Sequence, residues 1–172
     1  IVIYGKALGN GFPITAIVGK KSVMEAAQET FISSTFWTER SGVTAALKTL
    51  EIMNKNKTWE YITGIGQMMK SSWEKYAKIN NVEIELLGIP AIANFIFKDI
   101  NHNKYKTYMT KMFYDNKILA SNLFYPSTAH SKSDFTKYDQ VLDKTFYMIS
   151  KFQNGTENIE DFIETPFAHN TF

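Results

Sequence analysis

The sequence of 172 residues predicts a mixed fold with α/β and α+β character, divided into two regions near Asn80. Three observations support this prediction. Short β-branched runs open the chain, long helical periodicities occupy its middle, and strand-like runs then alternate with helical ones. Helices followed by separate groups of strands and helices are typical of α+β folds. We therefore expect one region over residues 1–79 and a second, α+β region over residues 80–172.

The first region begins with two expected strands that flank a glycine-rich loop. Residues 1–4 form a short β-branched run closed by a glycine, which is typical of a buried strand, and residues 14–18 form a second apolar run. Ser22 and Glu25 have the spacing of a capping box, so we expect a short helix to begin there. Residues 29–40 have no helical period and are rich in Ser and Thr, which favours a loop.

Two amphipathic helices are expected next. Apolar residues recur at helical spacing over residues 43–53 and again over residues 59–76, so each segment has one apolar face. The polar run at residues 54–57 separates the two segments. Gly64 and Gly66 lie inside the second helix, where each costs about 1 kcal/mol relative to alanine.

The second region is expected to alternate strands with helices. The candidate strands are short apolar runs at residues 82–87, 92–97, 118–120 and 123–125. The candidate helices have apolar residues at helical spacing, over residues 105–113, 135–152 and 159–162.

Composition excludes several classes of function. With 19 basic and 17 acidic residues the net charge is +2, which gives no electrostatic case for nucleic acid or an anionic membrane. The absence of cysteine excludes a disulfide framework and a thiolate zinc site. His102, His130 and His169 are isolated, so we expect no metal site. No apolar run approaches the ~18 residues of a membrane span, and the charge balance is compatible with the cytoplasmic location that we expect.

Lys6 is the strongest candidate for chemistry. It follows the first expected strand and is flanked by Gly5, Gly9 and Gly11, which allow the backbone to approach a ligand closely. A lysine at the mouth of an apolar strand is partly desolvated, which favours the neutral, nucleophilic amine that a Schiff base requires. An ordinary solvated turn lysine is the alternative. A phosphate-binding loop of the Walker type is excluded, because its lysine follows the glycines.

Residues 5–19, Gly-Lys-Ala-Leu-Gly-Asn-Gly-Phe-Pro-Ile-Thr-Ala-Ile-Val-Gly, resemble the lysine segment of class III aminotransferases. These are pyridoxal-phosphate enzymes of fold type I, and the group includes glutamate-1-semialdehyde 2,1-aminomutase. The resemblance implies that Lys6 holds pyridoxal 5'-phosphate as a Schiff base. Residues 34–42, Ser-Thr-Phe-Trp-Thr-Glu-Arg-Ser-Gly, are similar to the family's Gly-Thr-Phe-Ser-Gly-Asn-Pro loop. The resemblance further implies a homodimer, in which Thr35 binds the cofactor phosphate of the neighbouring subunit.

The second block departs from the family pattern at three positions. Thr38, Glu39 and Arg40 stand where the family has Gly-Asn-Pro, so the roles of these residues are open. Arg40 is the only arginine of the chain and has the planar guanidinium that binds a substrate carboxylate bidentately. A structural ion pair with Glu39 or another acid is the alternative.

The resemblance covers nearly the whole chain and implies the end of a large cofactor-binding domain followed by a small C-terminal α+β domain. It implies an aminotransferase that acts on a small amine or amino acid, with Lys6 moving the proton in a 1,3-shift. A 2,1-aminomutase and a non-enzymatic α+β module, in which Lys6 is a turn residue, are the alternatives. The family's phosphate cradle, ring-stacking aromatic residue and pyridine-nitrogen aspartate cannot be placed in this sequence, so we expect these 172 residues alone to be inactive.

Overall fold

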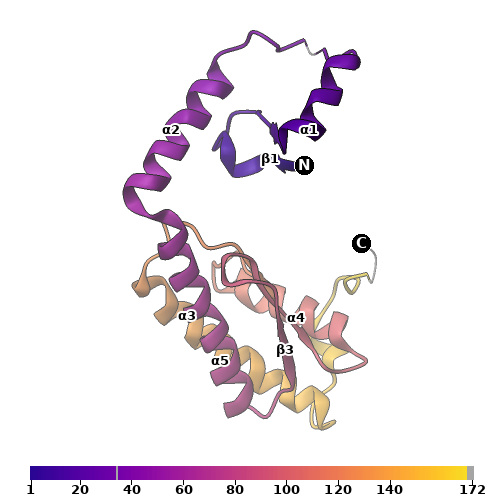
Figure 1. Ribbon diagram of the computed structural model, residues 1–172. Helices are drawn as coiled ribbons and strands as arrows, with labels where there is room; N and C mark the ends of the chain where they lie inside the picture. Colours follow the sequence, from indigo (N-terminus) through magenta and orange to yellow (C-terminus); the bar gives the residue numbers. More distant parts are fainter. Residues whose placement is uncertain (34, 170–172) are drawn as a thin grey trace. The chain divides into compact units, whose positions relative to one another are not determined.

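The computed structural model describes residues 1–33 and 35–169, which belong to two compact units, Ile1–Thr58 and Trp59–Phe172. The boundary between the units lies at the start of the long helix α3 (Thr58–Ile79), whereas we expected a division at its end. Helix α3 falls in the second unit because its buried residues, among them Met69 and Trp73, belong to the core of that unit (Figure 1). Within the described residues, no helix is long and apolar enough to cross a membrane.

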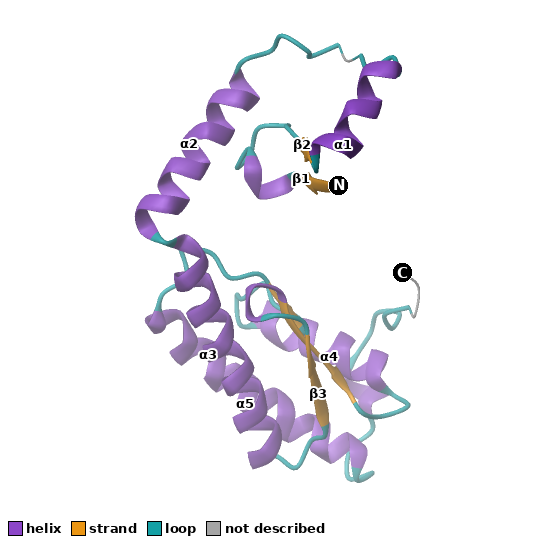
Figure 2. Ribbon diagram, viewed as in Figure 1, coloured by secondary structure: helices purple, strands orange, loops and turns teal. Residues whose placement is uncertain are grey.

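A short hairpin opens the first unit (Figure 2). Strand β1 (Val2–Tyr4) pairs antiparallel with β2 (Ala16–Val18), so that Ile3 stands opposite Ile17. Both predicted strands are confirmed, but the expected burial of the first is wrong, since Ile3 is 68% exposed. Three or more strands, or a packed helix, are needed to bury the face of a sheet, and this sheet has only two strands.

The short helix expected near Ser22 is present but begins differently. Helix α1 (Lys21–Met24) starts one residue earlier, with Lys20 as its N-cap and no side-chain cap, and the 3-10 turn η2 (Glu25–Glu29) continues it. An N-cap residue must have an extended backbone, and Ser22 lies inside the helix. The predicted capping box is therefore wrong.

The first amphipathic segment forms helix α2 (Ser41–Asn56), as predicted. Gly42 and Ala46 are its buried residues. The helix ends where Lys57 adopts the left-handed conformation at φ 47, with its amide donating to the carbonyl of Asn54. This C-cap geometry explains why the polar run separates two helices rather than interrupting one.

The second unit is built on an antiparallel sheet of order β3-β4-β5, formed by β3 (Ile84–Leu87), β4 (Ala93–Phe97) and β5 (Leu123–Phe124). Ala93, Phe95 and Phe97 of β4 are buried, whereas Ile96 between them is 42% exposed. One face of the sheet therefore carries the core, and the strands expected from apolar runs at 82–87, 92–97 and 123–125 are confirmed.

Helices α3, α4 (His102–Asp115) and α5 (Lys132–Gln153) cover the buried face of this sheet. The ring of Phe95 lies 4.9 Å from Trp73 of α3 and 6.0 Å from Phe146 of α5, and Phe97 lies 5.7 Å from Tyr105 of α4. The three expected helices are confirmed, and their aromatic faces meet on the sheet as a two-layer structure.

Helices α3 and α5 lie side by side (Figure 1) and are joined by one buried and one partly buried hydrogen bond. The indole Nε1 of Trp73 donates to the Tyr138 hydroxyl at 2.7 Å, and both residues are buried. Burial raises the pKa of Tyr138 well above its usual value of 10.0. Asn80, at the end of α3, donates to Asp143 of α5 at 2.8 Å.

Gly66 allows α3 to pass close to the 3-10 turn η3 (Pro90–Ile92). A Cβ atom at Gly66 would lie 1.8 Å from the carbonyl oxygen of Pro90, whereas at Gly64 nothing lies within 4 Å of the same position. Gly66 is thus required by a close approach between segments that are distant in sequence.

The strand expected at residues 118–120 is wrong. Helix α4 ends with Lys117 in the left-handed conformation at φ 63, and the Ile118 amide donates back to the carbonyl of Phe113 at 2.9 Å. This is the hydrogen bond of a helix C-terminal motif, so the amide that a strand needs is already used.

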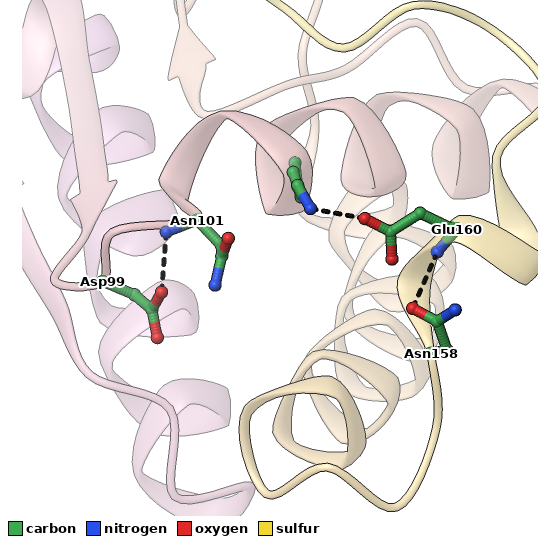
Figure 3. Close-up of polar contacts among 5 residues, drawn as sticks. Asp99, Asn101, Asn158 and Glu160 are labelled. Atoms are coloured by element: carbon green, nitrogen blue, oxygen red, sulfur yellow. Dashed lines mark hydrogen bonds and ion pairs between the residues drawn. The ribbon is translucent and has the colours of Figure 1, made fainter.

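The end of the second unit is bound to α4. The Asn101 amide donates to Asp99 Oδ1 at 2.7 Å at the start of this helix, and Asn158 accepts from the Glu160 amide (Figure 3). Lys104 of α4 forms an ion pair with Glu160 in the 3-10 turn η4 (Ile159–Phe162), the short helix expected there.

Candidate active site

Lys6 begins the 3-10 turn η1 (Lys6–Leu8), one residue after β1 ends. Its backbone is in the left-handed region at φ 50, a conformation that costs a residue with a side chain about 1–2 kcal/mol. Such strain is retained where the surrounding structure imposes it, and it is concentrated at functional sites. Lys57 and Lys117 adopt the same left-handed backbone at helix ends, so what sets Lys6 apart is its place in the glycine-rich loop that follows β1.

A series of tight turns fixes the loop after Lys6. The amides of Leu8, Asn10 and Phe12 donate to carbonyl oxygens three residues earlier, at 3.1–3.2 Å. A Cβ atom at the buried Gly9 would lie 2.0 Å from the carbonyl oxygen of Phe12, so only glycine allows this closure. At Gly9 the close approach is therefore between two parts of the chain's own backbone, whereas nothing lies within 4 Å of a Cβ position at Gly11.

The side chain of Lys6 is exposed in this chain. We expected a buried strand beside Lys6 to desolvate its amine in part. For the described residues this expectation is wrong, because β1 itself is exposed. The geometry leaves the primary amine open to a carbonyl reagent, which is the accessibility that a covalent lysine requires.

Thr35 opens an exposed turn over residues 35–38, followed by Glu39 and helix α2. The amide of Glu39 donates to the carbonyl of Phe36 at 3.0 Å and closes this turn. Trp37 in the turn is 69% exposed. Ser34, which belongs to the same sequence block, lies outside the described residues.

Glu39 caps the start of α2. Its Oε1 accepts from the Ser41 amide at 2.9 Å and its Oε2 accepts from the Gly42 amide at 3.2 Å. Hydrogen bonds from the side chain and backbone of Ser41, and from the Gly42 amide, hold the pKa of Glu39 below its usual value of 4.5. This role could not be predicted from the sequence, because Glu39 stands one residue before the N-cap and glutamate is not among the preferred capping residues.

Arg40 has no ion-pair partner within residues 1–33 and 35–169, and Glu39 uses its carboxylate on backbone amides instead. The structural ion pair considered for Arg40 is therefore wrong for the described residues. Its guanidinium is exposed at the N-cap position of α2.

The start of α2 packs on the segment that follows the Lys6 loop. A Cβ atom at the buried Gly42 would lie 3.1 Å from the Pro13 carbonyl oxygen and 3.2 Å from Ile14 Cβ. Through this contact, the helix that follows the Thr35 turn packs on the segment that follows the Lys6 loop. The side chains of Lys6 and Thr35 themselves lie on separate exposed segments.

The second unit contains a cavity of about 680 Å³, lined by Met69 of α3, by much of residues 117–125 and by the start of α5. His130 is in its wall. The Ser127 amide donates to His130 Nδ1 at 3.0 Å, and the imidazole packs on Phe124 with 5.0 Å between ring centroids. These contacts make His130 a part of the loop structure before α5.

Comparisons with known proteins agree with this arrangement. The family described as "Aminotransferase class-III" matches residues 1–120. The 3-aminobutyryl-CoA aminotransferase of Cloacimonas acidaminovorans (strain Evry) is 29% identical over 143 residues, which are 83% of this chain and 34% of that protein. A glutamate-1-semialdehyde 2,1-aminomutase of Methanococcus maripaludis (strain C7) is 30% identical over 155 residues, which are 84% of this chain and 36% of that protein. The chain spans about a third of the length of these relatives.

Solved structures give the same result for the fold. The PLP internal aldimine form of the FumI protein of Sphingopyxis sp. MTA144 superposes with a TM-score of 0.80 at 20% identity, over 94% of this chain and 39% of that one. An omega-transaminase from Sphaerobacter thermophilus gives a TM-score of 0.75 at 13% identity, over 87% of this chain and 38% of that one. The fold predicted from the lysine segment is confirmed, and with a family match over residues 1–120 the chain belongs to the class III aminotransferases.

Proposed function

We propose that this chain is part of a pyridoxal-phosphate-dependent aminotransferase that acts on a small amine or amino acid. In this proposal Lys6 binds the cofactor covalently, and Thr35 binds the cofactor phosphate at the neighbouring site of a homodimer. The observation that carries the proposal is the place of Lys6 in the glycine-rich loop that follows β1, within the residues 1–120 that match the family. A cytoplasmic location stays a prediction.

The side chains present suit the two ends of this cofactor. Lys6 offers an exposed primary amine for an aldehyde, and Thr35 offers a hydroxyl in an exposed turn, where it suits a phosphate oxygen. When bound, the cofactor supplies an electron sink for a carbanion at the substrate α-carbon.

Lys6 has two successive tasks in this function. Its amine would hold the bound cofactor in place and would become free for proton transfer once the substrate has bound. The freed amine is then a general base, which removes the proton from the substrate α-carbon and carries it to the acceptor position. Exposure of Lys6 and its fixed backbone are compatible with both tasks, since the long side chain moves while its Cα stays.

Covalent labelling tests the assignment of Lys6. The native protein is incubated with pyridoxal phosphate, reduced with borohydride, digested and mapped by mass spectrometry. We expect the reduced adduct on the peptide that contains Lys6, and none there in Lys6→Ala. A wild-type adduct confined to other lysines would refute the assignment and favour the non-enzymatic alternative, in which Lys6 is only a turn residue.

A 2,1-aminomutase is the second candidate, because several similar proteins carry that name. In a mutase the amine stays on one carbon skeleton, whereas a transferase needs a separate amino acceptor. Product analysis with and without an added oxo acid distinguishes the two. Turnover that requires the acceptor supports the aminotransferase, and turnover without any acceptor supports the mutase.

The proposed role of Thr35 has its own test. Thr35→Val removes the hydroxyl and should weaken pyridoxal-phosphate binding by about tenfold or more, since a hydrogen bond to a charged group contributes about 1.5–3 kcal/mol. Thr35→Ser keeps the hydroxyl and should retain most of the affinity. Sedimentation that shows a strictly monomeric native enzyme would contradict the assignment of Thr35 to a neighbouring site.

A further inference from the structure

Glu39 occupies one of the positions where this sequence departs from the family's Gly-Asn-Pro, and it contacts both the turn before it and the helix after it. We propose that Glu39 is a positioning residue, which fixes the Thr35 turn (residues 35–38) on the start of α2 and thereby orients Thr35 toward the cofactor phosphate. This inference rests on the proposed function, because it takes Thr35 as the phosphate ligand.

Glu39 caps two amides at the start of α2. Arg40 is at the N-cap position of α2, but its side chain caps no amide of the helix. The two oxygens of Glu39 instead accept from the Ser41 and Gly42 amides at 2.9 and 3.2 Å. The first amides of a helix have no partner within the helix, and its N-terminus favours negative charge. Both interactions hold the carboxylate, and with it the backbone of Glu39, in one place.

Glu39 also closes the turn that precedes it. The Glu39 amide donates to the Phe36 carbonyl at 3.0 Å, so Glu39 is bonded to the turn through its backbone and to the helix through its side chain. The Thr44 amide donates to the Arg40 carbonyl at 2.9 Å and begins the regular helix immediately afterwards. Thr35 therefore starts a turn whose far end is fixed to a helix of 16 residues.

The start of α2 that Glu39 caps is itself packed on another segment of the first unit. Gly42, one of the two residues whose amides bind Glu39, packs on Pro13 and Ile14 at the end of the Lys6 loop. Through Gly42, Glu39 links the Thr35 turn to the segment that carries Lys6. The carboxylate also uses the Ser41 and Gly42 amides, so those amides are not available to a phosphate, which leaves this task to Thr35 and its turn.

Hydrogen exchange tests the structural step on the 172-residue chain itself. Glu39→Ala should increase the exchange rate of the Ser41 and Gly42 amides by about fivefold, the usual effect of losing a cap. Glu39→Gln keeps one acceptor oxygen and should lie between wild type and alanine. Glu51→Gln is the matched control, because Glu51 is an exposed acid of the same helix that pairs with Lys48 at 2.7 Å, and its removal should leave both amides unchanged.

Cofactor selectivity tests the positioning step on the native protein. Pyridoxal lacks the phosphate, so a displaced Thr35 should weaken the binding of pyridoxal phosphate and leave that of pyridoxal unchanged. We expect Glu39→Ala to lower the ratio of the affinity for pyridoxal phosphate to the affinity for pyridoxal by about tenfold, the equivalent of one hydrogen bond to a charged group. Glu39→Gln should give an intermediate ratio, and Glu51→Gln should give the wild-type ratio.

The outcomes separate the two proposals. An unchanged ratio in Glu39→Ala, or an equal loss for pyridoxal and pyridoxal phosphate, would overturn the positioning role while Lys6 is still labelled by reduction. Absence of a label on Lys6 in the wild-type protein would overturn the proposed function instead. Unchanged exchange at Ser41 and Gly42 in Glu39→Ala would overturn the cap itself, whatever the cofactor result.

Discussion

Gly64 and Gly66 lie two residues apart in α3 and should respond to alanine in opposite directions. Each substitution gains about 1 kcal/mol of helix propensity. At Gly64 the new methyl group meets nothing within 4 Å, so we expect the free energy of unfolding to rise by about that amount. At Gly66 the methyl carbon would lie 1.8 Å from the Pro90 carbonyl oxygen and 2.5 Å from its carbonyl carbon.

The overlap at Gly66 must be relieved by moving backbone, because the carbonyl oxygen and carbonyl carbon of Pro90 belong to the main chain of η3. Overpacking of this kind costs about 1–3 kcal/mol and more where rigid backbone is involved, so the loss should exceed the gain in propensity. Urea unfolding followed by circular dichroism measures both variants against wild type. If Gly66→Ala proved as stable as Gly64→Ala, the close approach of α3 to η3 would be refuted.

Three further substitutions test other parts of the structure. Lys6→Gly should have a free energy of unfolding about 1 kcal/mol higher than Lys6→Ala, and therefore a higher melting temperature, since glycine adopts φ 50 without strain. Equal melting temperatures would contradict the left-handed backbone at this position. Hydrogen bonds from Ser131 hold the pKa of Asp134 below its usual 3.8. The Asp134 carboxylate therefore stabilises the folded state fully above pH 3.8, and this stabilisation is lost as the pH falls through the lower pKa of the folded state. Asp134→Asn should remove this part of the acid sensitivity in unfolding curves recorded from about pH 5 downward. Tyr138→Phe leaves the buried Trp73 indole without an acceptor and should lower the free energy of unfolding by about 1–3 kcal/mol in urea, whereas an unchanged midpoint would show that the hydrogen bond contributes nothing.

Helices and strands could be predicted from the sequence where the spacing of their apolar residues matches the face that is buried. The apolar spacing over residues 59–76 predicts α3, because Met69 and Trp73 on that face do enter the core. The alternation of β4 is similarly local, with Phe95 and Phe97 on the buried face. The family resemblance added the fold and directed attention to Lys6, which periodicity alone does not distinguish from other lysines.

Features that depend on distant partners could not be predicted. The apolar run at residues 1–4 has the composition of a buried strand, but burial requires a covering layer, and the described residues of its unit leave the strand exposed. Gly66 has the same sequence context as Gly64, and only the position of Pro90 separates them. The cap by Glu39 escaped prediction because the side chain reaches past the N-cap residue to the next two amides.

The three tryptophans give the two units different optical reporters. Trp73 is 0% exposed and lies in the core of the second unit, so its emission should shift to longer wavelength only when that core opens. Trp37 is 69% exposed, in the turn that begins at Thr35, and Trp59, at the start of the second unit, is 46% exposed. Replacing Trp59 by phenylalanine would leave one indole in each unit. In that variant the exposed Trp37 already emits at long wavelength, so a red shift along a denaturant gradient would report the opening of the second unit's core through Trp73.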